Sequence, residues 1–224
     1  MVEIKVLDKL EKSSGQAHAV ERAVIDDVVG RGVTIVSNTD SSFVAESDDV
    51  LYCVADRLSP VKSAVASAKA QGKKVVLLLS SADNSCGARH SVFAYLDKMP
   101  LLPSGVFDIK RLAPTLAQVV ADAAGLGATE ADRLMRSCGM FGAIVGGKLA
   151  GFIGSGVTGG MDILHLYDGE KQAQVGRELI KFLTTLIMTG GRVPFALVGS
   201  DDGARRQAFA ECGLTEGKLI AYVV

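Results

Sequence analysis

The sequence contains no tryptophan, and only 5% of its 224 residues are aromatic. Aromatic side chains are the platforms on which proteins stack the bases of single-stranded nucleic acids. An excess of charge is also lacking, because 24 basic residues are balanced by 25 acidic ones and the formal net charge is −1. No basic run offers the positive field that attracts a phosphate backbone. We therefore expect no nucleic acid among the partners of this protein.

Long apolar runs are missing as well. A membrane-spanning helix needs about 20 consecutive apolar residues, and the nearest candidate, residues 138–157, is interrupted by seven glycines and a lysine. The first residues, MVEIKVLDKLEK, lack the apolar core of a signal peptide. The four cysteines are scattered and form no CxxC pair, which is typical of reduced thiols in the cytosol. We expect a cytoplasmic protein with no membrane partner and no metal site.

Apolar residues make up 48% of the chain, enough for an extensive core. Residues 1–104 alternate between apolar strands and amphipathic helices. Strand–helix–strand repetition with short connections favours parallel pairing and right-handed crossovers. We therefore predict a flavodoxin-like α/β sandwich with a parallel sheet for residues 1–104. Its predicted strands are residues 3–8, 33–37, 49–55 and 73–80, and its predicted helices are residues 16–30 and 59–72.

The alternation of predicted strands and helices is interrupted at DKMPLLPSG, residues 97–105, where two prolines and a glycine predict a linker. Beyond it the predicted order is β-α-α-β-β-β-α-β-α-β, with Gly146-Gly147 as the turn of a hairpin. This order predicts a second domain, residues 105–224, of compact α+β type with a mixed, mostly antiparallel sheet. The boundary lies within residues 98–125, and no internal repeat is apparent. The apolar last strand, residues 218–224, could pair across a homodimer.

Three segments of the second half carry a family resemblance. GKLAGFIG forms the central hairpin, HLYDGEKQAQVGRELIKFL a strand, loop and helix, and DDGARRQAFAECGL a closing segment. In this order they resemble the GNAT superfamily of acyl-CoA-dependent N-acyltransferases. The resemblance implies acetyl-CoA, or another acyl-CoA, as cofactor. It also implies transfer of an acetyl or short acyl group to a primary amine on a small molecule or a protein.

The resemblance also implies which residues contact the cofactor. The family loop usually reads Arg/Gln-x-x-Gly-x-Gly/Ala, and Lys171, Gln174 and Gly176 stand at these positions, so that only the last matches well. In the closing segment Asp202 replaces the usual Asn and Phe209 the usual Tyr. The implied cofactor-binding residues are Leu166, Tyr167, Lys171, Gln172, Ala173, Gln174, Val175, Gly176, Arg177, Asp202 and Phe209.

The physics of a helix N-terminus supports a diphosphate site at this loop. The amides of residues 172–177 could converge on an anion, because the first helical N–H groups have no partner within the helix. Gly176 has no Cβ and permits a close backbone approach, and Lys171 and Arg177 could add charge-assisted bonds. The alternative is an ordinary strand–helix turn with a packing glycine and a solvated Lys/Arg pair.

Transfer to an amine requires a group that accepts the amine's proton. Asp162 and His165 lie on or beside the strand before the loop, and the alternation of a strand places Asp162 on the face opposite His165 and Tyr167. Asp162 has the better positional match to the family, whereas the ordinary pKa of histidine lies closer to neutrality. We expect one of the two to be the base, and we favour Asp162. Phe209 has no hydroxyl with which to protonate the leaving thiolate.

A rival interpretation concerns the first half, where polar residues follow several predicted strands. Asp8, Asp56, Ser80 or Ser81, and Lys110 resemble the constellation of a response-regulator receiver, although a lysine stands where the family's second acidic residue belongs. The resemblance implies a non-catalytic regulatory protein, with a receiver-like domain that binds phosphate or a small ligand and a degenerate GNAT-like sensor domain. The plainer alternative is that these polar residues cap helices and line solvated turns.

Overall fold

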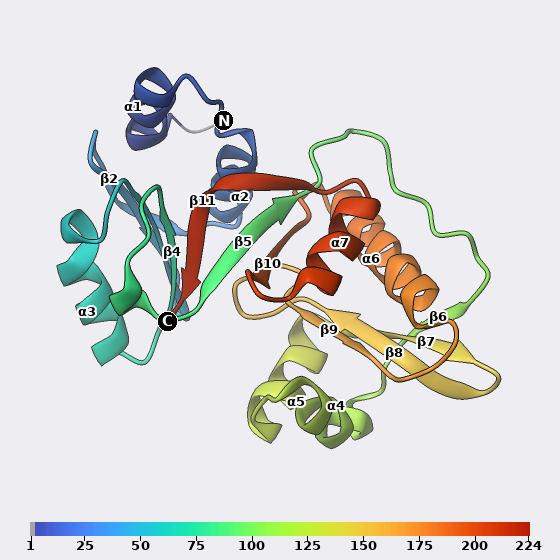
Figure 1. The fold of residues 1–224 in the computed structure, drawn as a ribbon. Coiled ribbons are helices and arrows are strands. Elements are labelled where there is room, and N and C mark those ends of the chain that lie inside the picture. The colour runs from blue at the N-terminus through green and yellow to red at the C-terminus, as the bar shows by residue number, and fades with distance from the viewer. Residues whose placement is uncertain (1–2) are drawn as a thin grey trace. The chain divides into compact units, whose positions relative to one another are not determined.

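A computed structural model describes residues 3–224 (Figure 1). The chain forms two compact units. The first contains the residues up to Leu96 together with Phe195–Arg206 and Leu214–Val224, and the second contains Asp97–Pro194 with Gln207–Gly213. The first change of unit thus lies near the predicted boundary at residue 104, whereas the last two strands of the chain belong to the first unit.

The first unit is built on a seven-stranded sheet with the order β1-β2-β3-β4-β11-β5-β10. Strands β3 and β4 run parallel, and all the other neighbouring strands are antiparallel. The strands are β1 (Thr34–Asn38), β2 (Ser42–Glu46), β3 (Val50–Ala55), β4 (Lys74–Leu79), β5 (Arg89–Ala94), β10 (Phe195–Gly199) and β11 (Thr215–Val223). The helices are α1 (Lys5–Ser14), α2 (Ala19–Gly30) and α3 (Lys62–Ala70), with short 3₁₀ turns η1 (Ser59–Val61) and η2 (Asn84–Cys86).

The flavodoxin-like parallel sandwich predicted for residues 1–104 is therefore not the observed arrangement. β1, β2 and β3 form an antiparallel meander, because the turns between them are far shorter than the dozen or so residues of a parallel crossover. β11 lies between β4 and β5, and Figure 1 shows it in red beside these green strands. Both edges of β11 are thus paired within the chain, so the dimer pairing predicted for residues 218–224 has no free edge.

Residues 3–8, predicted as a strand, form the start of helix α1 instead. The neighbouring side chains of Val6 and Leu7 are both buried, although a strand would point them to opposite faces. In the helix they share one face with Leu10, at the spacing of an amphipathic helix. The predicted helices 16–30 and 59–72 are confirmed as α2 and as η1 with α3.

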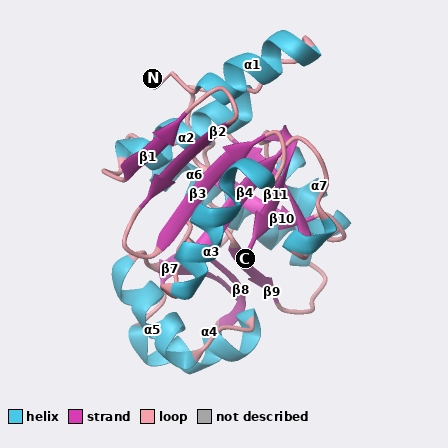
Figure 2. Ribbon diagram, turned by 90° about the vertical axis from the view of Figure 1, so that its left-hand side faces the viewer, coloured by secondary structure: helices cyan, strands magenta, loops and turns pink. Residues whose placement is uncertain are grey.

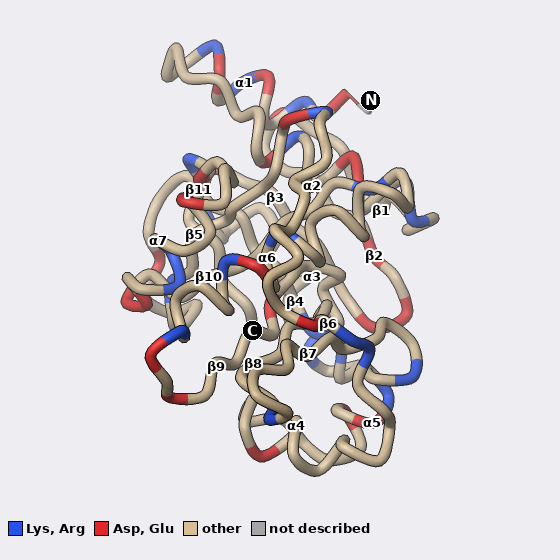
Figure 3. The backbone as a smooth tube through the Cα atoms, turned by 90° about the vertical axis from the view of Figure 1, so that its right-hand side faces the viewer, with Lys and Arg blue, Asp and Glu red and all other residues tan. Residues whose placement is uncertain are grey.

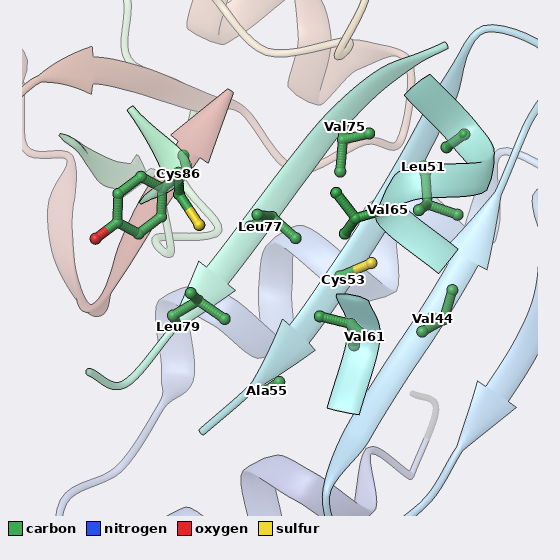
Figure 4. Close-up of a cluster of buried hydrophobic side chains, with 12 residues drawn as sticks. Val44, Leu51, Cys53, Ala55, Val61, Val65, Val75, Leu77, Leu79 and Cys86 are labelled. Carbon is green, nitrogen blue, oxygen red and sulfur yellow. The ribbon is translucent and has the colours of Figure 1, made fainter. Parts of the chain in front are cut away.

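An apolar core lies between α3 and the sheet. Figure 2 shows α3 across the face of β3 and β4, and Figure 4 shows the side chains that pack there. Burial raises the pKa of the Cys53 thiol in this cluster to about 12, so the group stays protonated. The cluster consists of Val44, Leu51, Cys53, Ala55, Val61, Val65, Ala68, Val75, Leu77, Leu79, Cys86 and Tyr222.

The second unit contains a four-stranded antiparallel sheet with the order β6-β7-β8-β9. The element order predicted for the second half is confirmed throughout, and Gly146 and Gly147 form the hairpin turn with φ values of 57° and 78°. The elements are β6 (Asp108–Arg111), η3 (Pro114–Leu116), α4 (Ala117–Ala124), α5 (Ala128–Ser137), β7 (Met140–Val145), β8 (Lys148–Gly154), β9 (Ile163–Leu166), α6 (Gln172–Thr189) and α7 (Gly203–Glu211), which crosses between the units.

Helices cover both faces of this smaller sheet, with α4 and α5 on one side and α6 on the other (Figure 1). Phe152 of β8 and Ile163 of β9 pack with the helices α4 and α5. On the opposite face Phe182 of α6 packs against Phe141 of β7, with ring centroids 5.1 Å apart. Within residues 3–224, no helix combines the length and the apolar character needed to cross a membrane.

The segment between β5 and β6 contains no helix or strand, as predicted for the linker. Two hydrogen bonds hold it against α6. The amide of Ser104 donates to Glu178 at 2.5 Å, and the hydroxyl of Thr185 donates to the carbonyl of Leu101 at 2.6 Å. Burial opposes ionisation of Glu178, but the bonds from Ser104 and Lys181 outweigh it and hold the pKa of this carboxyl below its ordinary value.

A buried carboxylate fixes an irregularity in the larger sheet. The pairing of β11 with β5 shifts register between Glu216 and Ile220. Glu21 of α2 is fully buried there, and its Oε1 atom accepts the amides of Lys218 at 2.5 Å and Leu219 at 2.8 Å. The carboxylate therefore replaces the acceptors that the bulge takes away from these amides.

Glu21→Ala should lower the free energy of unfolding by about 2–4 kcal/mol, because the part-buried amide of Lys218 and the buried amide of Leu219 lose their acceptor. Glu21→Gln is the matched control, since it keeps an acceptor oxygen and should lose clearly less. Urea unfolding of the two variants and the parent measures the difference. Equal losses in the two variants would contradict this role of the carboxylate oxygen.

Candidate functional site

A pocket of about 350 Å³ lies in the second unit, where β9 is followed by α6. Its size falls within the range of small-molecule sites. Its floor is apolar and its rim is charged. The lining residues are Val145, Lys148, Leu149, Ala150, Tyr167, Asp168, Gly169, Glu170, Lys171, Gln172 and Val175.

The N-terminus of α6 at the edge of this pocket has two free amides. The amide of Gln172 donates to the carbonyl of Gly169 at 3.1 Å, and that of Val175 donates to the carbonyl of Lys171 at 2.9 Å. Between them, the amides of Ala173 and Gln174 have no acceptor in residues 3–224, and both residues are exposed. The six converging amides predicted for residues 172–177 are thus reduced to two, because the turn and the helix use the others.

The charges on the rim cancel. Lys148 and Lys171 carry positive charge, Asp168 and Glu170 carry negative charge, and all four side chains are exposed. Figure 3 shows acidic and basic segments following one another in the loop after β9. Anion binding here would therefore depend on the two free amides and the nearby lysines, because the pocket as a whole offers no excess of positive charge.

Gly176 packs against the protein itself. A Cβ at Gly176 would lie 2.9 Å from Cδ1 of Leu166, which is closer than real Cβ contacts come. Gly151, which pairs with Leu166 across β8 and β9, is equally tight, since a Cβ there would lie 2.8 Å from the carbonyl oxygen of His165. The two glycines thus let α6 and β8 close around Leu166. The close approach predicted for Gly176 is to this side chain.

Three other predicted cofactor residues lie away from the pocket lining. Arg177 forms an ion pair with Glu211 of α7 at 3.0 Å. Phe209 is fully buried. Asp202 belongs to the first unit, where its carboxylate accepts the amide of Arg205 at 3.0 Å and caps α7. Of the predicted set, the pocket is lined by Tyr167, Lys171, Gln172 and Val175.

Asp162 anchors the glycine-rich loop that joins β8 to β9. Its carboxylate accepts a hydrogen bond from the hydroxyl of Thr158. The same hydroxyl accepts the amide of Gly160 at 3.2 Å, and the amide of Gly156 donates to the carbonyl of Gly160 at 2.9 Å. This position suits a carboxylate that fixes a loop.

His165 lies on the other side of β9, as the alternation predicts. Its ring stacks on Phe152 with centroids 5.4 Å apart and meets the edge of Tyr167 at 4.7 Å. The side chain is half-buried, and its ring nitrogens have no hydrogen-bond partner in the part of the chain that the structure describes. The described protein therefore leaves these nitrogens unengaged, although His165 is not one of the residues that line the pocket.

The receiver-like constellation does not form. Asp8 lies within helix α1, where its carboxylate binds Arg22. The hydroxyls of Ser80 and Ser81 donate to the backbone carbonyl of Asp56, at 2.9 and 2.7 Å. Lys110 belongs to β6 of the second unit and pairs with Asp108 at 2.6 Å. Across residues 3–224, no group of three His, Cys, Asp or Glu side chains is placed to hold a metal ion.

Several solved structures are similar to this chain over most of its length. A protein from Novosphingobium aromaticivorans assigned to the GNAT acetyltransferases has a TM-score of 0.59 at 13% identity, covering 92% of this chain and 97% of its own. A GCN5-related N-acetyltransferase from Kribbella flavida has a TM-score of 0.53 at 13% identity, with coverages of 92% and 94%. The chain has the GNAT fold. A Drosophila protein has a TM-score of 0.56 at 15% identity, with coverages of 98% and 94%.

No protein-family model matches the sequence, and no curated protein matches it either. The fold therefore rests on the TM-scores, and at identities of this size the reaction has to be argued from the site. The pocket lies at the predicted turn between β9 and α6, but seven of its lining residues were not in the predicted set. Asp168, Gly169 and Glu170 stand inside the quoted segment. Val145, Lys148, Leu149 and Ala150 come from the β7–β8 hairpin, which only the folded structure brings to the pocket.

Gly176→Val should lower the free energy of unfolding by about 1–3 kcal/mol, because the added groups collide with Leu166. Gly169→Val is the matched control, since nothing lies within 4 Å of a Cβ at that position. Adding Leu166→Ala to Gly176→Val should recover part of the loss by making room. Urea unfolding of the four proteins tests this, and equal losses at the two glycines would refute the packing role.

Proposed function

We propose that this protein is a GNAT-type N-acetyltransferase, which transfers an acetyl or other short acyl group from acyl-CoA to a primary amine. The acceptor would be a small molecule or a protein. The observation that carries the proposal is the pair of free amides of Ala173 and Gln174, at a helix N-terminus beside a pocket of about 350 Å³. Free amides at such a helix end bind phosphate groups, and the helix dipole favours negative charge there.

The residues of the pocket fit the chemistry of an acyl-CoA. The amides of Ala173 and Gln174 would donate to the diphosphate, and Lys171 at the N-cap would add a charge-assisted bond. Leu149 and Val175 supply apolar surface in the same pocket. β9 pairs only with β8 in its sheet, so the backbone groups of its other edge could bind the amides of an extended ligand chain.

His165 is the better candidate for the base. When bound, the thioester would supply the carbonyl carbon to which the amine nitrogen forms its new bond, while the bond from that carbon to sulfur breaks and releases a thiolate. His165 would take the proton that the amine gives up, since its ring nitrogens are free, whereas Asp162 is held by Thr158. Phe209 has no acidic proton and is fully buried, so this position supplies no acid and the sulfur would take its proton from water.

A second candidate function is a non-catalytic regulatory protein whose GNAT-like fold only senses acyl-CoA. The burial of Phe209 and the balanced charges on the pocket rim favour it, because both make the site poorer for catalysis than for binding. The receiver-like part of that alternative has lost its support, since Asp8 is engaged by Arg22. Turnover with any amine acceptor would separate the two candidates.

Acetyl-CoA should raise the melting temperature of the protein by mass action, because it binds the folded state alone. Lys171→Glu should weaken binding at least about tenfold, since a charge-assisted bond is replaced by repulsion. Lys110→Glu is the control, because Lys110 lies on β6 at the opposite edge of the same sheet. Calorimetric titration of the three proteins measures the affinities. Equal affinities would place the binding site elsewhere.

His165→Ala should lower kcat about 10²–10⁴-fold, the usual contribution of a general base. The rise of kcat with pH that marks deprotonation of the base should vanish in this variant. Asp162→Asn should keep the pH profile and lower kcat much less, because its role is to hold the loop. A steady-state pH series with an amine acceptor measures both. A lost pH dependence in Asp162→Asn alone would reverse the assignment.

A further inference from the structure

The order of elements in the first half of the chain is repeated in the second half. Helices α1 and α2, the meander β1-β2-β3, helix α3, and strands β4 and β5 follow one another over residues 5–94. Helices α4 and α5, the meander β7-β8-β9, helix α6, and strands β10 and β11 follow in the same order over residues 117–223, except that helix α7 lies between β10 and β11 where only the 3₁₀ turn η2 lies between β4 and β5. We call these ranges the N-terminal copy and the C-terminal copy. Both meanders are antiparallel, and each has a register shift in its first hairpin.

Glycines with positive φ mark the same three places in both copies. The first ends the first helix of the copy, the second precedes the meander, and the third lies between the helix after the meander and the next strand. The other residue types avoid this backbone region, so each place constrains the chain in the same way. The pairs are Gly15 and Gly125 (φ 67° and 66°), Gly32 and Gly139 (84° and 78°), and Gly72 and Gly191 (73° and 73°).

The strand register supports the repeat independently. Aligning Gly72 with Gly191 matches Leu79 of β4 to Val198 of β10, because each follows its glycine at the same distance. Leu79 pairs with Ile220 of β11, and Val198 pairs with Ser91 of β5. Ile220 should then correspond to Ser91, and these two residues are themselves paired. The pair maps onto itself, as expected at a pseudo-twofold axis of the sheet.

We infer that the chain is a duplicated fold in which each copy is completed by the last strand of the other. β5 of the N-terminal copy pairs with β10, and β11 of the C-terminal copy pairs with β4. In the resulting order β4-β11-β5-β10, the two outer strands, β4 and β10, each follow the helix after the meander of their copy, and the two inner strands, β11 and β5, are each the last strand of their copy. The order is therefore the same when read from either end. The partner of the C-terminal copy is therefore the N-terminal copy of the same chain, as in a dimer that has exchanged strands.

We assign the ligand site to the C-terminal copy alone, and this assignment rests on the proposed function. β3 and β4 are paired in parallel from Val50 to Ala55, whereas the corresponding β9 and β10 belong to different sheets. At residues 60 and 61, the turn after β3 also offers no free amide. Pro60 has no N–H, and the amide of Val61 donates to the carbonyl of Leu58 at 3.0 Å.

Cleavage of the connection between the copies tests the exchange of strands without any ligand. A specific protease site inserted between Lys98 and Met99, both exposed, allows the folded full-length chain to be cut once. We expect the two fragments to elute together at the size of the intact protein and to separate only in denaturant. Fragments that separate without denaturant would overturn the inference, because two independent domains would behave in that way.

Titration of the intact chain with acetyl-CoA tests which copy binds. We expect one molecule of acetyl-CoA to bind per chain. Lys171→Glu should lower the affinity at least about tenfold. Arg57→Glu, the matched change after β3, should leave the affinity unchanged within about twofold. Two molecules per chain, or an equal loss in Arg57→Glu, would overturn the assignment of a closed N-terminal copy. Absence of all binding would refute the proposed function and with it the single site, whereas the exchange of strands would still be decided by the cleavage result.

Discussion

Hydrogen bonding between β5 and β11 is the constraint on which the rest of the larger sheet depends. These strands lie more than a hundred residues apart in the sequence, yet Ser91 pairs with Ile220, and each strand is flanked by a strand from the other half of the chain. Closing such a long loop costs conformational entropy before any contact compensates for it. Because the strands of the two halves alternate in the order β4-β11-β5-β10, neither half completes its sheet alone. Glu21 stabilises the irregular stretch of the pairing between β5 and β11.

Local patterns sufficed to predict the order of elements in the second half, but not that β10 and β11 join the sheet of the first unit. The Gly146-Gly147 turn is a property of neighbouring residues, and the structure confirms it. The same approach failed where local patterns mislead or where partners are distant. β2 and β5 contain polar and charged residues and were missed, and the antiparallel partner of β4 is a strand that no local pattern could indicate. The repeat is not apparent in the sequence, because the two copies resemble one another in element order, glycine backbone conformation and strand register, which only the structure shows.

The location of the candidate site was also predictable, but its chemistry was only partly so. An apolar strand followed by an amphipathic helix indicated the turn that carries Lys171 and Gln172. Which amides remain free depends on the hydrogen bond from Gln172 to Gly169, and the role of Gly176 depends on where Leu166 packs. Both are tertiary details. The fold thus leaves two unpartnered amides at one helix end, and the account of function rests on what binds them.

Amide hydrogen exchange at Ala173 and Gln174, measured by NMR with and without CoA, tests this claim most directly. Bound phosphate oxygens would accept hydrogen bonds from these two amides and slow their exchange, whereas the amides of Leu58 and Val61 at the corresponding turn of the N-terminal copy should not change. Unaltered exchange at Ala173 and Gln174 in the presence of saturating CoA would contradict the account.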